Sequence, residues 1–166
     1  MTILIRDAQL DDAEGIVKVL NPIIQTGLYT ALTTPFSIET EQEFISHFPK
    51  RGIFHIAVCL NEQKIVGLQN VEPFASYTSA FDHVGVIGTF VDLSYRRQGI
   101  GKSLFQATFQ AGRQKGYEKL FAFVRADNTA ALAAYQNQDF NIIGTARKHA
   151  KIYGMYVDEI MIEKFL

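Results

Sequence analysis

The chain has 166 residues, a formal net charge of −1, 48% hydrophobic and 20% charged residues, one cysteine and four histidines. This length fits a single domain over residues 1–166, and the composition excludes a disordered chain and a basic, nonspecific nucleic-acid binder. The lone Cys59 cannot form an internal disulfide, and its combination with four histidines offers no zinc-ligand spacing, so we expect no metal.

The N-terminal residues and the apolar stretches bear on targeting. Met1–Asp7 lacks a basic region followed by an apolar one, so no signal peptide is expected. The longest apolar stretch lies near Val84–Val91 and is far shorter than the roughly 20 residues that cross a bilayer. We therefore expect a cytoplasmic protein with no membrane partner.

The N-terminal third of the chain predicts one strand and two helices. The β-branched run Thr2–Arg6 predicts the strand, and Leu10–Asp12 supplies an N-cap for a helix that we expect to be interrupted near Pro22. A second helix is predicted over Thr40–Phe48, where Pro49 follows and ends it.

The rest of the chain alternates strands and helices. Phe54–Leu60 and Lys64–Val71 are joined by Asn61–Gln63, which predicts an antiparallel hairpin. The later elements are predicted as strand His83–Val91, helix Gly99–Gln114, strand Leu120–Val124, helix Asp127–Asn137, and strands Phe140–Gly144 and Val157–Phe165. Because a strand–helix–strand crossover joins parallel strands, we expect parallel pairing at the sheet centre and antiparallel pairing beside it. The predicted fold class is α/β with a mixed sheet.

A glycine-bearing turn between a strand and the longest predicted helix is the most informative segment. Helix N-termini carry unpaired N–H groups, and glycines at 99 and 101 let the backbone approach an anion closely. The turn also gathers three basic side chains, Arg96, Arg97 and Lys102. Together these features favour a phosphate-bearing ligand, although a tight turn without a ligand would also use these glycines.

Spacing separates three phosphate-binding templates. A P-loop would match Gly101-Lys102-Ser103 at its end, but its first glycine would fall on Arg96. A Rossmann fingerprint would need a third glycine where Leu104 stands. The pattern that remains is Arg-x-x-Gly-x-Gly between a strand and a helix.

A second set of polar residues follows the next predicted strand. Asp127 or Asn128 can cap the helix, and Asn128, Ala131 and Tyr135 share one face at steps of three and four. The small Ala131 leaves room for a ligand between an amide and a phenol. A helical tyrosine is also often a core residue with a solvated hydroxyl.

These two segments together resemble one enzyme family. Arg96-x-x-Gly99-x-Gly101, after the strand residues Thr89-Phe90-Val91-Asp92, resembles the acetyl-coenzyme A signature of the GNAT acetyltransferases. Asn128-x-x-Ala131-x-x-x-Tyr135, followed by Asp139-Phe140, looks like the second GNAT motif, with Asp139 in place of a turn glycine. The resemblance extends over essentially the whole chain. In Leu20–Thr26 and Thr34–Phe48 it is most similar to the phosphinothricin N-acetyltransferase branch.

The resemblance implies a single-domain GNAT-like fold and an acetyl-CoA-dependent N-acetyltransferase without a metal. It implies that Tyr135 protonates the departing thiolate, and that a backbone N–H near Phe90-Val91 stabilises the oxyanion. The implied cofactor-binding residues are Thr89, Phe90, Val91, Arg96, Arg97, Gln98, Gly99, Ile100, Gly101, Lys102 and Asn128.

The acceptor half of the site is less defined. Relatives often use a strand glutamate as general base, but the corresponding positions are Val86 and Phe123. Candidates by proximity are Glu72, Asp82, His83 and Asp92. Aromatic side chains that could line an acceptor pocket, or simply pack in the core, are Phe36, Phe44, Phe48, Phe74 and Tyr77.

The expected acceptor is a primary amine of a small molecule or amino-acid-like compound. The open alternatives are a protein N-terminal or lysine acetyltransferase, a P-loop nucleotide hydrolase, and a non-catalytic coenzyme A sensor, which the missing strand carboxylate keeps in view. No nucleic-acid partner is expected, and many relatives form homodimers, which the closing strands could also mediate here.

Overall fold

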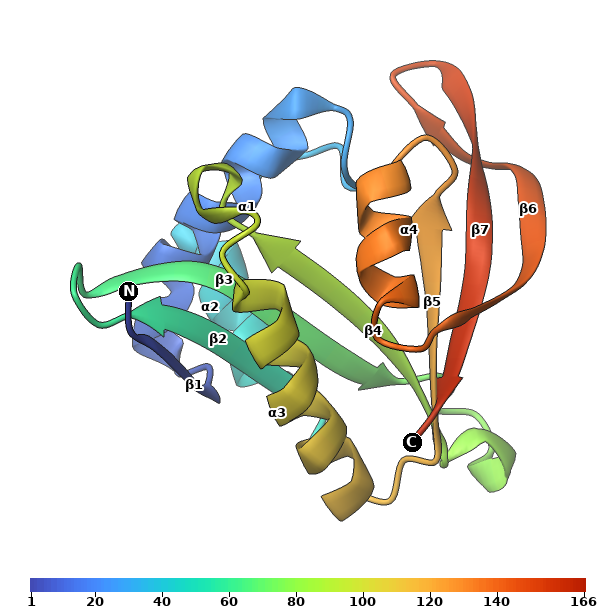
Figure 1. Ribbon diagram of the computed structural model, residues 1–166, viewed down its shortest axis with the longest axis horizontal. Helices are drawn as coiled ribbons and strands as arrows, with labels where there is room; N and C mark the ends of the chain where they lie inside the picture. Colours follow the sequence, from blue (N-terminus) through green and yellow to red (C-terminus); the bar gives the residue numbers. More distant parts are fainter.

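The computed structural model describes residues 1–166 and contains one seven-stranded sheet in the order β1-β2-β3-β4-β5-β7-β6 (Figure 1). Its strands are β1 (Ile3–Asp7), β2 (Ile53–Cys59), β3 (Lys64–Pro73), β4 (Val84–Val91), β5 (Lys119–Arg125), β6 (Asn141–Ile152) and β7 (Met155–Phe165). Its helices are α1 (Ala13–Thr26), α2 (Ile38–Ser46), α3 (Ile100–Gln114) and α4 (Thr129–Gln136), with short 3-10 turns η1 (Leu10–Asp12), η2 (Ser79–Phe81) and η3 (Leu93–Tyr95). No helix is both long and apolar enough to cross a membrane.

The two faces of the sheet carry different helices. Successive strand residues point to opposite faces, and the neighbours Ile53 and Phe54 accordingly belong to different core clusters. Phe54 packs with buried residues of α1, whereas Ile53 packs with Phe105 of α3 and Tyr135 of α4. The sheet is therefore covered by α1 and α2 on one face and by α3 and α4 on the other, which confirms the predicted α/β class.

The first helix departs from the prediction in two ways. It runs without a break through Pro22, because its buried face, which includes Ile16 and Ile23, packs on the sheet and offsets one missing backbone bond. Asp12 does not cap α1 through its side chain. Its carboxylate instead accepts from the Gln9 amide at 2.7 Å and pairs with Arg6 at 2.7 Å.

The C-terminal hairpin is longer than the sequence indicated. The predicted strand Phe140–Gly144 is too short, since β6 continues to Ile152 and pairs with β7 from Met155 onward. Most β6 residues are solvent-exposed, and the register shifts between Ala146 and Ala150. An exposed, irregular edge strand has no apolar alternation, which is the signal that sequence analysis needs.

The predicted parallel pairing occurs between β4 and β5, and it is short. It joins Val84 with Lys119 and ends at the pair of Val86 with Phe121. Beyond that pair the two strands separate, and α4 and the N-terminal end of α3 lie on either side of β4's free edge (Figure 1). We call the opening between β4 and β5 the fork, because it exposes the main chain at the centre of the sheet.

Candidate active site

The turn before α3 presents unpaired backbone amides beside the fork. Gly99 has a φ of +81° and Arg97 a φ of +61°, both left-handed conformations. The first amide bonded into α3 is that of Ser103, which donates to the Gly99 carbonyl at 3.1 Å. The amides of residues 98–102 therefore have no main-chain acceptor and can bind an anion.

Gly101 lies in open space at the start of α3. Its φ is not left-handed, and an added Cβ would meet no heavy atom within 4 Å. Neither backbone conformation nor packing inside the protein thus requires glycine at this position. An anionic ligand on the turn amides would require it, because a side chain here would occupy the approach to those amides.

The basic side chains of the turn differ in their surroundings. The Arg96 guanidinium lies over the Tyr29 ring, 4.0 Å from its centroid, so it links the turn to the loop between α1 and α2. Arg97 and Lys102 are exposed and face solvent. Arg97 and Lys102 therefore supply the positive charge that remains available at the turn.

The predicted cofactor-binding strand residues use their side chains for packing. Phe90 packs with the α1 cluster, and Val91 and Ile100 pack in a third cluster beneath α3. The Thr89 hydroxyl bonds to other side chains. What these residues can offer a ligand is therefore their main chain, which on β4 is unpaired toward β5 beyond Val86.

Tyr135 reaches the fork from α4. Tyr135 is only 7% exposed, and its ring packs edge-on against Phe105 and Phe140. Its hydroxyl lies 3.0 Å from Thr89 Oγ1. Burial raises the pKa of Tyr135 to about 12, against a smaller lowering by the Thr89 hydrogen bond. The phenol therefore keeps its proton throughout the neutral pH range.

Asn128 is the cap of α4, which settles the choice between it and Asp127. Its Oδ1 accepts from the Ala131 amide at 3.1 Å, and its Nδ2 donates to the Tyr29 carbonyl at 3.2 Å. Asn128 thus holds the α1–α2 loop against α4, with one amide hydrogen left for a ligand.

Arg125 is a site residue that sequence reasoning missed. It is buried at the end of β5, donates to the carbonyls of Gly27 at 2.7 Å and Thr30 at 3.1 Å, and pairs with Asp127 at 2.7 Å. These bonds fix the α1–α2 loop at the open end of the fork. An arginine that ends an otherwise apolar strand was the available signal, but the two carbonyls that it binds lie 98 and 95 residues away and leave no local pattern.

Two of the four candidate bases have other partners. Asp92 accepts from the Ser94 amide at 2.9 Å and pairs with Lys64 at 3.0 Å, and Asp82 pairs with Arg51 at 3.3 Å. His83 is exposed just before β4.

Glu72, the remaining candidate, is half-buried on β3, directly opposite Val86 where the fork begins. Asn70 Nδ2 donates to its carboxylate at 3.2 Å. Burial raises the pKa of Glu72 above its usual value.

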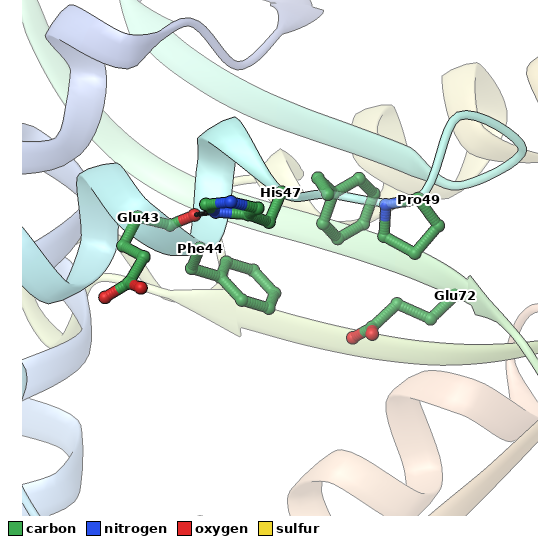
Figure 2. A pocket seen from close by; sticks show the side chains of 6 residues that line it. Glu43, Phe44, His47, Pro49 and Glu72 are labelled. Carbon is green, nitrogen blue, oxygen red and sulfur yellow. Dashed lines mark hydrogen bonds between the residues drawn. The ribbon is translucent and has the colours of Figure 1, made fainter.

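Glu72 also borders a groove between α2 and β3. Figure 2 shows its carboxylate extending from the strand toward the ring of Phe44, with Glu43 and His47 on the α2 side. The groove has a volume of about 360 Å³ and is lined by Glu43, Phe44, His47, Phe48, Pro49 and Glu72. Of the five aromatic residues considered for an acceptor pocket, Phe44 and Phe48 lie here, Phe36 packs against the α1 core cluster, and Phe74 and Tyr77 pack around Phe81.

Comparison with known proteins decides the family. The model of the Acetyltransferase (GNAT) family matches residues 23–140, which include the turn, the fork and α4. The chain belongs to the GNAT acetyltransferase family. The expected enzyme class, an acetyl-CoA-dependent acetyltransferase, is thereby confirmed, and the P-loop alternative is wrong.

The relatives agree with this membership. The chain is 31% identical to human N-acetyltransferase 8 over 100 residues, which cover 60% of this chain and 43% of that protein. It is 23% identical over 163 residues to an L-methionine sulfoximine/L-methionine sulfone acetyltransferase of Pseudomonas aeruginosa, covering 95% of this chain and 91% of the relative.

A solved GNAT phosphinothricin acetyltransferase from Sinorhizobium meliloti, in complex with AcCoA, has the same fold. It superposes with a TM-score of 0.89 at 18% identity, covering 100% of this chain and 89% of that one. The chain is also 23% identical over 141 residues to the Putative phosphinothricin acetyltransferase YwnH of Bacillus subtilis, covering 82% of each chain, which confirms the predicted similarity to the phosphinothricin acetyltransferase branch.

Proposed function

We propose that this GNAT enzyme transfers the acetyl group of acetyl-CoA to a primary amine of a small molecule by direct attack, with Tyr135 as general acid. The observation that carries the proposal is the buried Tyr135 hydroxyl, 3.0 Å from Thr89 Oγ1 on the free edge of β4. A proton donor thus lies where the sheet opens between β4 and β5.

The turn suits the pyrophosphate of coenzyme A. The open space at Gly101, where a side chain would occupy the approach to the amides, and the free amides of residues 98–102 are the features that fit it. Arg97 and Lys102 add charge, and Asn128 keeps an N–H for the pantetheine arm. The unpaired main chain of Thr89–Val91 can donate to the thioester oxygen.

Once the amine is neutral, the chemistry requires two further protons to move. The neutral amine attacks the thioester carbon, a C–N bond forms, and the charge that develops on oxygen is stabilised by a β4 amide. As the C–S bond breaks, Tyr135 gives its proton to the thiolate. A thiol, with a pKa near ~8.5, is a stronger acid than this phenol, so proton transfer from Tyr135 to the thiolate is unfavourable by itself. The tyrosine therefore recovers a proton from the newly bonded nitrogen, which loses its extra hydrogen as the amide forms.

Glu72 is the general base that we propose for the amine. Alkylammonium groups must lose a proton before attack, and Glu72 is the candidate base that lies half-buried on the central strands. Its carboxylate faces the α2 groove, where the acceptor would lie. Val86 and Phe123, the positions that correspond to a strand glutamate in relatives, cannot serve.

The name of one relative and the size of the groove support a small, amino-acid-like acceptor. One relative is named for methionine sulfoximine and methionine sulfone, which are amino-acid-like amines, and a groove of about 360 Å³ suits a molecule of that size. Protein N-terminal or lysine acetylation is the alternative within the class. The net charge of −1 supports the prediction that the protein has no nucleic-acid partner. A cytoplasmic location and a homodimer also stay predictions.

The test is thiol release from acetyl-CoA with separate panels of amino acids, polyamines, aminoglycosides and peptides, with mass detection of the product. Turnover on at least one small amine supports the proposal. Turnover on peptides alone would favour the protein-acetylating alternative, and coenzyme A binding without any turnover would favour a sensor. Tyr135→Phe should lower kcat by about 100-fold and leave acetyl-CoA binding intact. Unchanged kcat would remove the acid role.

A further inference from the structure

Three polar side chains from different elements form a chain of hydrogen bonds that ends on Tyr135; Gln69 and Tyr135 are buried, and Thr89 between them is partly buried. Gln69 on β3 and Thr89 on β4 are paired in register, so their side chains share the face toward α4. Gln69 Nε2 donates to Thr89 Oγ1 at 2.8 Å, and Thr89 Oγ1 lies 3.0 Å from Tyr135 Oη. Gln69 is 0% exposed.

The donor at one end fixes the direction of the chain. The amide nitrogen of Gln69 can only donate, so the Thr89 hydroxyl oxygen accepts there and its single hydrogen must find another acceptor. The phenolic oxygen of Tyr135 is the partner within reach. If Tyr135 donated to Thr89 instead, the Thr89 hydrogen would be left without a partner at a partly buried position, which is costly.

Packing does not account for an amide at position 69. Its Oε1 is buried and has no hydrogen-bond partner, while the neighbouring buried residues on this face, such as Val71 and Ile87, are aliphatic. An apolar side chain of the same size would avoid an unsatisfied acceptor. The donor that Gln69 offers to Thr89 is therefore the property that distinguishes it from a core leucine.

We infer that Gln69 and Thr89 are positioning residues that hold a hydrogen-bond donor on the phenolic oxygen of Tyr135 and so leave the phenolic proton free for the departing thiolate. The inference rests on the proposed acid role of Tyr135. When the C–S bond breaks, the sulfur takes the Tyr135 proton, and the negative charge left on Oη is stabilised by the Thr89 hydroxyl.

The same bond strengthens the acid. Burial opposes ionisation of Tyr135, whereas the Thr89 hydrogen bond acts in the other direction on its pKa. A donor already placed on Oη costs no reorganisation at the moment of proton transfer. Loss of the Thr89 hydroxyl should therefore slow the chemical step rather than weaken cofactor binding.

The test compares Thr89→Val with Thr89→Ser in steady-state kinetics with acetyl-CoA and an amine that the panel assay identifies. Thr89→Val keeps the shape and should lower kcat by about tenfold, the worth of one hydrogen bond, with KM for acetyl-CoA within about twofold. Thr89→Ser restores the hydroxyl and should recover most of kcat. Gln69→Met, which removes the amide donor, should lower kcat by about fivefold.

Two controls make the outcome decisive. Thr108 is a fully buried threonine on α3 whose hydroxyl lies 2.9 Å from His55 Nδ1, away from the fork. Thr108→Val should lower the melting temperature about as much as Thr89→Val while kcat stays within about twofold. An equal kcat loss in Thr108→Val would overturn the positioning role as a general stability effect.

The second control uses a Tyr135→Phe background. There Thr89→Val should cause no further loss of kcat, because the acceptor of its hydrogen bond is gone. Additive losses of kcat in the double variant would overturn the proposal that Thr89 acts through Tyr135. If Tyr135→Phe loses activity but Thr89→Val does not, the positioning role of Gln69 and Thr89 is wrong and the acid role of Tyr135 stands. If Tyr135→Phe itself keeps full kcat, the proposed acid role fails first.

Discussion

The two halves of the proposed active site, which bind the cofactor and the acceptor, are built in different ways. The cofactor half consists of short continuous segments, the turn Arg96–Lys102 and the start of α4, and it offers mainly backbone amides. The acceptor half brings together α2 and the end of β3, two segments that are far apart in the sequence. A ligand that is bound by backbone leaves a motif in the sequence, whereas one bound by dispersed side chains does not.

The halves also differ in charge and solvation. The turn places Arg97 and Lys102 in solvent, where water screens them. The α2 side instead holds one buried carboxylate, Glu41, and one half-buried carboxylate, Glu72, and burial raises the pKa values of both. Substitutions on the acceptor side should therefore have larger and more pH-dependent effects than those of single charges at the turn.

The largest effect expected on the acceptor side concerns Glu72. Glu72→Gln should lower kcat/KM for the amine by about 100-fold at pH 7, the usual worth of a general base. In the wild type, activity should fall as pH falls through the raised pKa of Glu72, because the protonated form cannot accept a proton. This acid limb should vanish in the variant.

Glu43→Gln is the matched control for Glu72→Gln, because Glu43 lines the same groove from the exposed side of α2. It should change kcat/KM by less than about threefold. Similar losses in both variants would mean that the groove contributes charge only. An unchanged kcat/KM in Glu72→Gln would contradict the base role of Glu72 and, with it, the proposed difference between the two halves.

Loss of the Arg125 clamp should loosen the α1–α2 loop, whose Tyr29 contacts Arg96 and Asn128 on the proposed cofactor side. Arg125→Met leaves the carbonyls of Gly27 and Thr30 without donors and should destabilise the fold by about 2–4 kcal/mol. KM for acetyl-CoA should therefore rise more than KM for the amine. Thermal unfolding and both KM values check this, and an equal rise in both would contradict a clamp that serves one half.

The pH dependence of stability tests whether the Glu41 carboxylate of α2 is buried. It is 3% exposed, its Oε1 has no hydrogen-bond partner, and burial raises its pKa to about 7. Since its folded pKa lies above its unfolded one, the folded state binds the extra proton and stability falls as pH rises from about 4.5 to about 7. Glu41→Gln should therefore raise stability by about 1–3 kcal/mol at pH 8 and have little effect at pH 4.

Chemical denaturation at the two pH values measures the Glu41 effect. Exposed Glu43, two residues on in the same helix, again provides the control, since Glu43→Gln should change stability by no more than about 0.5 kcal/mol at either pH. Equal stabilisation by Glu41→Gln at pH 4 and pH 8 would contradict a buried, titrating carboxylate.

The smallest effect is expected at the charged side chains of the turn. Lys102→Ala should raise KM for acetyl-CoA by about threefold at low salt, and the difference should shrink at 0.5 M salt because the charge is exposed. A salt-independent loss of tenfold or more would show that side chains, not amides, dominate this half.

Most of the fold was predictable because its elements have strong local signals. The turn chemistry at Asn61–Gln63 correctly predicts the β2–β3 hairpin, and the long helix after Gly99 correctly predicts the parallel β4–β5 pair. Pro22 misleads because the buried face of α1 overrides a local preference. The end of β6 was missed because an exposed edge strand buries too little to show alternation.

The candidate site divides in the same manner. The residues of the turn, Asn128 and Tyr135 could be named from spacing, but their contacts could not. That Asn128 bonds to Tyr29, and that Thr89 bonds to both Gln69 and Tyr135, depends on segments brought together only by the sheet. Arg125 and Gln69 had no motif to reveal them.

The central claim is that the turn amides bind acetyl-CoA, and isothermal titration of the wild type and Gly101→Trp tests it most directly. The wild type should bind acetyl-CoA, and Gly101→Trp should abolish binding, since its side chain would fill the approach to the amides. The melting temperature should stay within a few degrees, because a Cβ at this position meets no protein atom within 4 Å. Unchanged affinity in a folded Gly101→Trp variant would contradict the account.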